Sequence, residues 1–90
     1  MPDDAEWEAL VGSAFDTDWG AMTLTEVDRR SEQSFSLVFH GPADGTRDQG
    51  IHQVFNEQTG TLDVFLVPIG ATDDRVEYEA VFNRGPHSTS

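Results

Sequence analysis

The most constraining feature of this 90-residue sequence is the segment 61–70, in which apolar side chains are more continuous than anywhere else. Alternation along a strand divides these side chains between two faces, with Leu62, Val64 and Leu66 on one and Phe65, Val67 and Ile69 on the other. Because both faces are apolar from residue 64 onward, we expect this to be the most buried strand, covered on both sides. Pro68 cannot donate a ladder hydrogen bond, so the strand must end, bulge or lie at an edge there.

Five further segments show strand-like alternation, with polar turns between them: 13–19, 22–29, 34–40, 50–57 and 75–83. Segments 22–29 and 34–40 are predicted to form a hairpin, and a bulge near Thr25 or Glu26 would bring Val27 back into phase. In 50–57, His52 and Val54 share one face, and Ile51 and Phe55 share the other. The last three strands are predicted to form an antiparallel meander.

Residues 3–11 are predicted to form a short helix, capped by Asp3 or Asp4 and ended by Gly12, with one apolar stripe formed by Trp7, Leu10 and Val11. The predicted fold class is all-β with one short N-terminal helix. It is a small antiparallel barrel or two-layer sandwich of five or six strands, with the helix closing one end. An open sheet with the helix on one face is the alternative. Residues 1–84 form a single β-rich domain in this interpretation, and 85–90 a disordered tail.

The charge of the chain narrows the classes of partner. Seventeen acidic residues stand against five basic ones, all arginine, for a formal charge of −12. Nucleic acid is excluded as a partner because its phosphates would be repelled. Two explanations of the acidity remain open: adaptation to high salt, or an arginine-for-lysine bias of a GC-rich genome together with ordinary solubility.

The absence of cysteine and the pattern of the N-terminus limit the chemistry and the location expected of the protein. Cysteine is absent, so packing alone must hold the core and no thiolate chemistry is available. The N-terminus has no basic and apolar leader pattern, and no run is long enough to span a membrane. We therefore expect a soluble, cytoplasmic protein without a membrane partner.

No group of side chains predicts a metal or catalytic site. Two acidic clusters, Asp16-Thr17-Asp18 and Asp73-Asp74, do not fit the spacing of a calcium loop, and solvated turns explain them. The three histidines also lack metal-ligand spacing, so we interpret His40 as a loop-facing polar residue, His52 as a partly buried, hydrogen-bonded ring, and His87 as part of the tail.

The remaining polar residues give no better candidate. The serines of Gly12-Ser13 and Gln33-Ser34 lack a nucleophile elbow and an identifiable base. Glu77 and Glu79 share one strand face, which a solvated face explains. We therefore expect no enzyme activity and no cofactor. The longest irregular segment, 41–49, is predicted to be a compact surface loop and is the first loop to consider for function.

Several sequence blocks, taken in order, resemble a family of short bacterial domains of unknown function, about 90 residues long. The blocks are Phe35-Ser36-Leu37-Val38-Phe39-His40-Gly41-Pro42, Gln49-Gly50, Phe65-Leu66-Val67-Pro68-Ile69-Gly70 and Tyr78-Glu79-Ala80-Val81-Phe82-Asn83-Arg84, preceded by an opening segment 7–15. Members of the family usually have an aromatic residue near position 52 and a histidine near 56, where this chain has His52 and Asn56. This departure weakens the idea of a shared imidazole site.

The resemblance implies no catalytic residues and associates the chain with gene neighbourhoods of phage-tail-like proteins. Our first hypothesis is a non-enzymatic interaction or assembly module, such as an accessory of a tail-like particle, whose partner is another protein. The alternative is a β-barrel that binds a small ligand or a cation. The oligomeric state is left open. If the family shares a functional surface, the loop 41–50 and the Asn83-Arg84 end are where it is expected.

Overall fold

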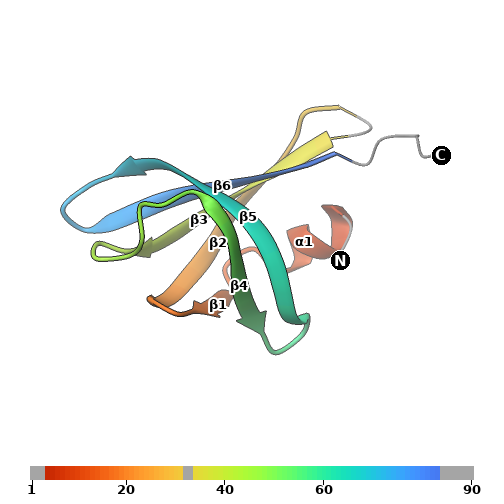
Figure 1. The fold of residues 1–90 in the computed structure, drawn as a ribbon. Coiled ribbons are helices and arrows are strands. Elements are labelled where there is room, and N and C mark those ends of the chain that lie inside the picture. Colours follow the sequence, from red (N-terminus) through yellow and green to blue (C-terminus); the bar gives the residue numbers. More distant parts are fainter. Residues whose placement is uncertain (1–3, 32–33, 84–90) are drawn as a thin grey trace.

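The computed structural model describes residues 4–31 and 34–83, which form one short helix and six strands (Figure 1). In chain order the elements are α1 (Asp4–Ala9), β1 (Ala14–Thr17), β2 (Gly20–Arg29), β3 (Ser34–Pro42), β4 (Gly50–Asn56), β5 (Gly60–Ala71) and β6 (Arg75–Asn83). Each predicted element is present, although the first strand is shorter than expected and ends at Thr17. The predicted tail 85–90 lies outside the described residues.

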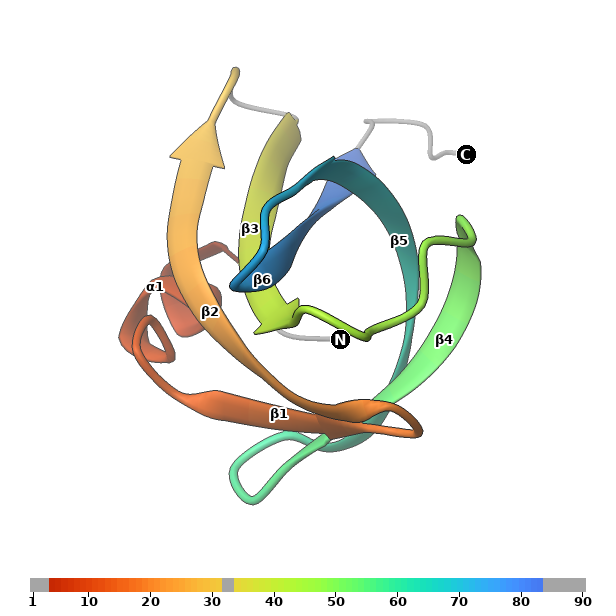
Figure 2. The same cartoon turned by 90° about the vertical axis from the view of Figure 1, so that its left-hand side faces the viewer.

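The six strands close into an antiparallel barrel in the order β1-β2-β3-β6-β5-β4, which encircles one axis in Figure 2. The barrel alternative of the predicted fold class is therefore confirmed. The predicted hairpin is the β2–β3 pair, and the predicted meander is the run β4–β5–β6. The connections within the hairpin and within the meander are short, as expected for antiparallel neighbours.

Buried apolar side chains from every strand fill the inside of the barrel. They are joined by two residues of the N-terminal segment, and the set comprises Trp7, Leu10, Phe15, Met22, Leu24, Phe35, Leu37, Phe39, Val54, Val64, Leu66, Val76, Tyr78 and Ala80. The inward positions follow the period of two that the sequence predicts for β2 to β6. The interior is thus a packed core made from one face of each strand.

Two bulges keep this inward pattern in phase. The β2–β3 register shifts between Leu24 and Glu26, as predicted, and Val27 packs against the core. The β5–β6 register shifts between Pro68 and Gly70, which is the irregularity that proline requires in a strand.

The helix α1 covers one end of the barrel, as predicted. Trp7 is fully buried, and its ring centroid lies 5.7 Å from that of Phe15 and 6.0 Å from that of Phe82. The helix ends at Ala9 and the chain turns at Gly12, whose φ is +92°. Val11 therefore lies beyond the helix and is exposed, so its predicted place on the buried stripe is wrong.

An ion pair fastens α1 to β2. The Arg29 guanidinium donates from Nε to Asp4 Oδ2 at 2.6 Å and from Nη2 to Glu8. The hydrogen bond to Asp4, followed by the charge of Glu8, raises the pKa of Arg29. The helix is too short to be stable alone, so this contact and the buried Trp7 hold it on the barrel.

Candidate interaction surface

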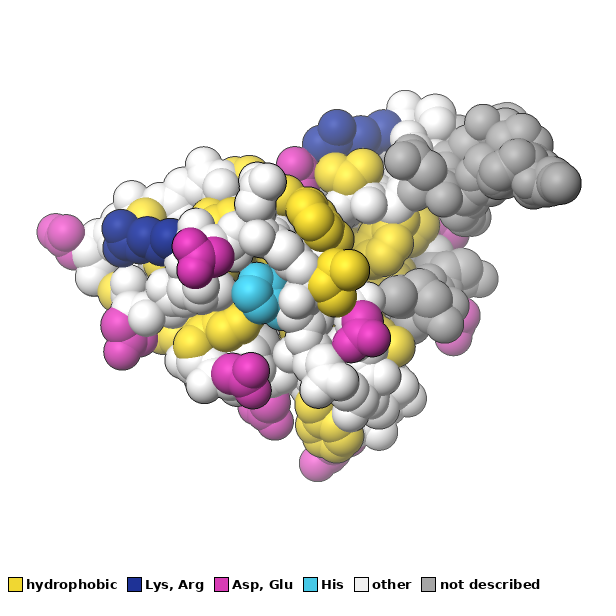
Figure 3. All heavy atoms as spheres, viewed as in Figure 1, with side chains coloured by type: hydrophobic (Ala, Val, Ile, Leu, Met, Phe, Trp, Pro, Cys, Tyr) yellow, Lys and Arg dark blue, Asp and Glu magenta, His cyan; other side chains and the backbone are white. Residues whose placement is uncertain are grey.

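The outer face of β4, β5 and β6 carries large apolar side chains that remain exposed to solvent. We call these five side chains the outer patch. Their exposed fractions are Ile51 71%, Phe65 51%, Ile69 49%, Val81 48% and Phe55 45%. Figure 3 shows hydrophobic side chains gathered on this side of the molecule with acidic side chains among them. Single exposed apolar residues are ordinary, but a group on one face indicates a contact surface.

The outer patch corrects the prediction that both faces of β5 are covered. Phe65 and Ile69 are about half exposed, whereas Val64 and Leu66 on the inner face are buried. The physical reason is that the sheet closes on itself, so the barrel itself covers only the inner face. The one described helix lies over an end of the barrel and leaves the outside of β5 open (Figure 1).

The strand register brings members of the outer patch together. Ile51 and Phe65 are directly opposite one another in the β4–β5 ladder, so their Cβ atoms lie about 4.5 to 5.5 Å apart. The next outward pair along the same ladder is Gln53 and Asp63, and the one after it includes Phe55. A carboxylate therefore lies within the apolar surface.

The ladder between β1 and β4 is the weakest part of the barrel wall. It consists of a single pair, Asp16 opposite Phe55. The buried Asn56 supports this seam, because its Nδ2 donates to Ala14 O at 3.0 Å and its Oδ1 accepts from the Gln58 backbone N–H at 2.8 Å. Both polar ends of the amide are thus used in holding the fold.

Two open hollows flank the seam on the outside of the barrel. One, of about 360 Å³, is lined by Ser13, Ala14, Asp16, Phe55, Asn56, Glu57 and Gln58. The other, of about 230 Å³, is lined by Asp16, Thr17, Asp18, Gln53, Val54, Phe55 and Thr61. The outer patch therefore continues at Phe55 into a hollowed, acidic part of the surface.

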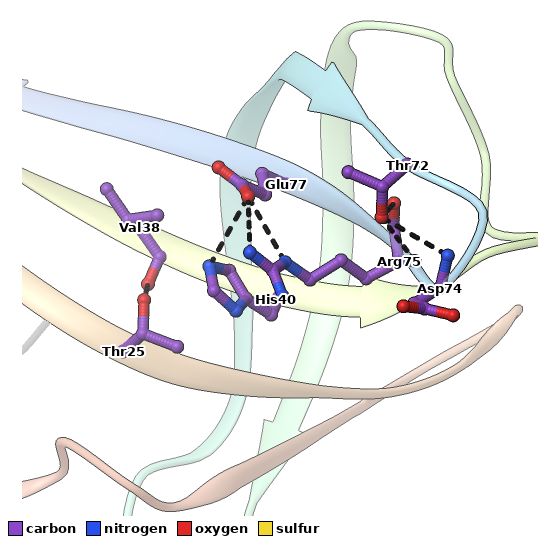
Figure 4. A network of polar contacts seen from close by, with 7 residues as sticks. All are labelled: Thr25, Val38, His40, Thr72, Asp74, Arg75 and Glu77. Atoms are coloured by element: carbon purple, nitrogen blue, oxygen red, sulfur yellow. Dashed lines mark hydrogen bonds and ion pairs between the residues drawn. The ribbon is translucent and has the colours of Figure 1, made fainter.

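Another part of the outer surface, on β3 and β6, is polar instead. Arg75 donates to Glu77 Oε2 at 3.1 Å, and His40 Nε2 lies 3.8 Å from the same oxygen (Figure 4). Glu79 is paired with Arg30 at 2.9 Å. Glu77 and Glu79 thus lie on the outer face, as the alternation predicted, and exposed pairs of this kind contribute little to stability. His40 faces β6 across the sheet rather than a loop, which corrects its interpretation as loop-facing.

The end of the barrel near Tyr78 is closed by aromatic rings and the loop 43–49. The His52 ring lies edge-on to Trp19 at 4.9 Å, and its Nε2 is 3.2 Å from Asp48 O. The prediction of a partly buried, hydrogen-bonded ring for His52 is confirmed. Tyr78 donates from Oη to Thr46 O at 2.6 Å, and burial raises the pKa of its phenol.

The loop itself differs from the predicted surface loop at Gly45, which is buried. A Cβ at this position would lie 2.5 Å from Tyr78 Oη and 2.8 Å from a carbon of the Trp19 ring. Glycine is therefore needed here for close packing of backbone on rings. The loop 41–50 was predicted to be the first place to look for function. At Gly45, however, this loop packs on the core and closes one end of the barrel.

The other residues considered as site candidates are not brought together. Among residues 4–31 and 34–83, no group of three or more His, Asp or Glu side chains could hold a metal ion. In the turn after β5, the Asp74 backbone N–H donates to Thr72 Oγ1 at 3.2 Å, as in an ordinary polar turn. Asn83 ends β6, while Arg84 and His87 lie outside the described residues.

The fold and surface together define a small closed β-barrel domain with a helix over one end and an apolar outer face. A family model described as a domain of unknown function, DUF6916, matches residues 3–82, and the chain belongs to that family. The resemblance to short domains of unknown function is thereby confirmed at this level. Searches of curated proteins and of solved structures gave no match.

The outer patch was not identified as a site from the sequence, although its residues were placed on the correct strand faces. Phe65 and Ile69 were assigned to a second covered face, and Ile51 and Phe55 to the face opposite Val54. The sequence pattern alone does not show that the sheet closes into a barrel. In a closed single sheet every residue out of phase with the core faces outward, so large apolar residues there are the signal.

Proposed function

We propose that this chain is a non-enzymatic interaction module that binds another protein through the outer patch. The observation that carries the proposal is the exposure of five large apolar side chains on the outside of β4, β5 and β6, where the fold does not need them. Aliphatic and aromatic side chains on an open sheet face provide the apolar centre of a protein interface. Two of them, Ile51 and Phe65, adjoin directly.

Charge and core packing support a protein partner over the alternatives. A formal charge of −12 disfavours nucleic acid. The inside of the barrel is filled by large side chains such as Trp7, Phe15 and Tyr78, so the packing gives no support to a small ligand bound within it. No helix of the described residues is long and apolar enough to cross a membrane.

Within this class, the resemblance described above favours an accessory of a phage-tail-like particle. Assembly of such a particle would use a permanent, apolar contact of the kind the outer patch offers.

Affinity capture with matched variants tests the proposal. Three chains are immobilised in equal amounts and exposed to native lysate. They are the wild type, the double variant Ile51→Thr/Phe65→Thr and the control Val11→Thr. The control changes an exposed valine outside the patch. We expect one protein to be recovered by the wild type and the control but not by the double variant. That protein, once purified, should bind the wild-type chain in calorimetry with fixed stoichiometry. Equal recovery by all three chains would refute the patch as the binding surface.

A further inference from the structure

The chemistry of the partner can be inferred from a carboxylate inside the outer patch. Asp63 projects from the outer face of β5 between Thr61 and Phe65, and its cross-strand neighbour is Gln53. It is exposed, and within the described part of the chain it takes part in no ion pair. Two arginines that reach β6 are already paired, Arg30 with Glu79 and Arg75 with Glu77.

A partner that covers the outer patch from Phe65 to Phe55 must also cover Asp63, because the Gln53–Asp63 pair lies between the two pairs that contain these residues. Removing a carboxylate from water is costly unless a cation and hydrogen-bond donors replace the solvent. An apolar partner surface would therefore be rejected at this point, whereas a surface with one basic side chain would be accepted.

The geometry fixes where that basic side chain must lie. Asp63 and Phe65 are two residues apart on the same strand face, which corresponds to about 7 Å. The same spacing separates alternate residues of a strand, whereas one turn of a helix is shorter, at about 5.4 Å. We infer that the outer patch binds a protein surface on which a lysine or arginine lies about 7 Å from a large apolar side chain. The inference rests on the proposed function and specifies its partner.

A second copy of this chain does not satisfy these requirements. In a two-fold interface each surface meets itself, so a dimer centred on the patch would bring the two Asp63 carboxylates close together. Each copy also carries a formal charge of −12. The charge complementarity of the patch points to a cationic partner instead.

The inference is tested with backbone-cyclised hairpin peptides that display Leu, Lys and Leu at alternate positions on one face. A second hairpin has Glu in place of Lys. Each is titrated into the ¹⁵N-labelled full chain, and backbone amide shifts are followed. We expect the Lys hairpin to shift amides of β4 and β5 and to bind about tenfold or more tightly than the Glu hairpin, with an affinity that falls as salt rises.

Two carboxylate variants separate a specific contact from general attraction. Asp63→Asn and Asp73→Asn remove the same charge, but Asp73 lies in the turn between β5 and β6. Asp63→Asn should weaken binding of the Lys hairpin about tenfold, and Asp73→Asn less than about twofold. Equal effects of the two variants, or equal binding of the two hairpins, would overturn the inference.

The captured protein distinguishes this inference from the function on which it rests. If its binding is lost in Ile51→Thr/Phe65→Thr but unchanged in Asp63→Asn, the interaction module stands and the cationic partner is refuted. A concentration-dependent dimer of the wild-type chain that Phe65→Thr abolishes in sedimentation velocity would likewise overturn the choice of partner.

Discussion

Neighbouring residues of β5 have opposite surroundings. Leu66 is fully buried among the core side chains, whereas about half of Phe65 is exposed on the outside of the barrel. On β4, Val54 and Ile51 show the same contrast. Burial of the inner residues accounts for the fold, because apolar area removed from water is the main stabilising term. The outer residues gain little of that stabilisation, and their apolar character is the basis of the proposed protein contact.

The largest loss of stability is expected when a side chain on the inner face is truncated. Leu66→Ala is expected to lower the free energy of unfolding by about 2 to 5 kcal/mol, since it removes buried methyl groups and leaves a cavity. Urea titration measures the change. A loss below about 1 kcal/mol would mean that Leu66 does not belong to the main core.

A smaller loss is expected where the loop 43–49 packs on the rings. Gly45→Ala places a methyl group 2.5 Å from Tyr78 Oη, so the loop must shift, at an expected cost of about 1 to 3 kcal/mol. Gly70→Ala is the matched control, because no atom lies within 4 Å of its added Cβ. Equal stability of the two variants in urea would show that the loop does not close the core.

The phenol of Tyr78 makes the stability of this closed end of the barrel depend on pH. Its raised pKa means that the folded state favours the neutral phenol, which also donates to Thr46 O. The sign follows from linkage: the stabilisation is complete below the unfolded-state pKa of about 10 and is lost as pH rises through the folded-state pKa. Tyr78 is the only tyrosine, so ultraviolet absorbance reports it alone.

Absorbance should show a titration midpoint for the native chain above that of the urea-unfolded chain. Tyr78→Phe should cost about 1 kcal/mol at neutral pH, mostly through the partly buried Thr46 carbonyl left without its donor. Coincident midpoints for native and unfolded chains would contradict the tight closure of this end.

Salt acts on the outside of the barrel and should change stability less. Repulsion among carboxylates at a charge of −12 opposes folding, so stability should rise with sodium chloride from near zero to about 0.2 M. The gain is expected to be below about 1 kcal/mol, as for other exposed charges. A continued rise above about 1 M would favour the high-salt explanation of the acidity, because screening is saturated there. A flat melting temperature would refute both explanations.

The sequence predicted the elements well because local patterns determine them. Alternation located the β2–β6 core positions, and Pro68 and the phase of Val27 located the two bulges, whereas the helix expected to extend to Val11 ends at Ala9. The sequence allowed either a barrel or a sandwich, and only the single β1–β4 pair, Asp16 with Phe55, distinguishes the closed barrel. A contact between residues so far apart in the chain leaves no local pattern.

The candidate surface was less predictable for the same reason. Whether Phe65 is covered depends on what lies outside β5, and periodicity cannot distinguish a two-sided strand from a barrel strand with an apolar exterior. The ion pair of Arg29 with Asp4 and the burial of Gly45 also depend on tertiary contacts. Charge, by contrast, needs only counting, and a formal charge of −12 is sufficient for the prediction that nucleic acid is not a partner.

The stability of Ile51→Thr tests most directly the claim that the inner face holds the fold and the outer face does not. Both side chains are β-branched and suit a strand, and Ile51 is 71% exposed. The free energy of unfolding in urea should therefore stay within about 0.5 kcal/mol of wild type. A loss above about 1.5 kcal/mol would contradict the account, since it would show that the outer patch is part of the packed core.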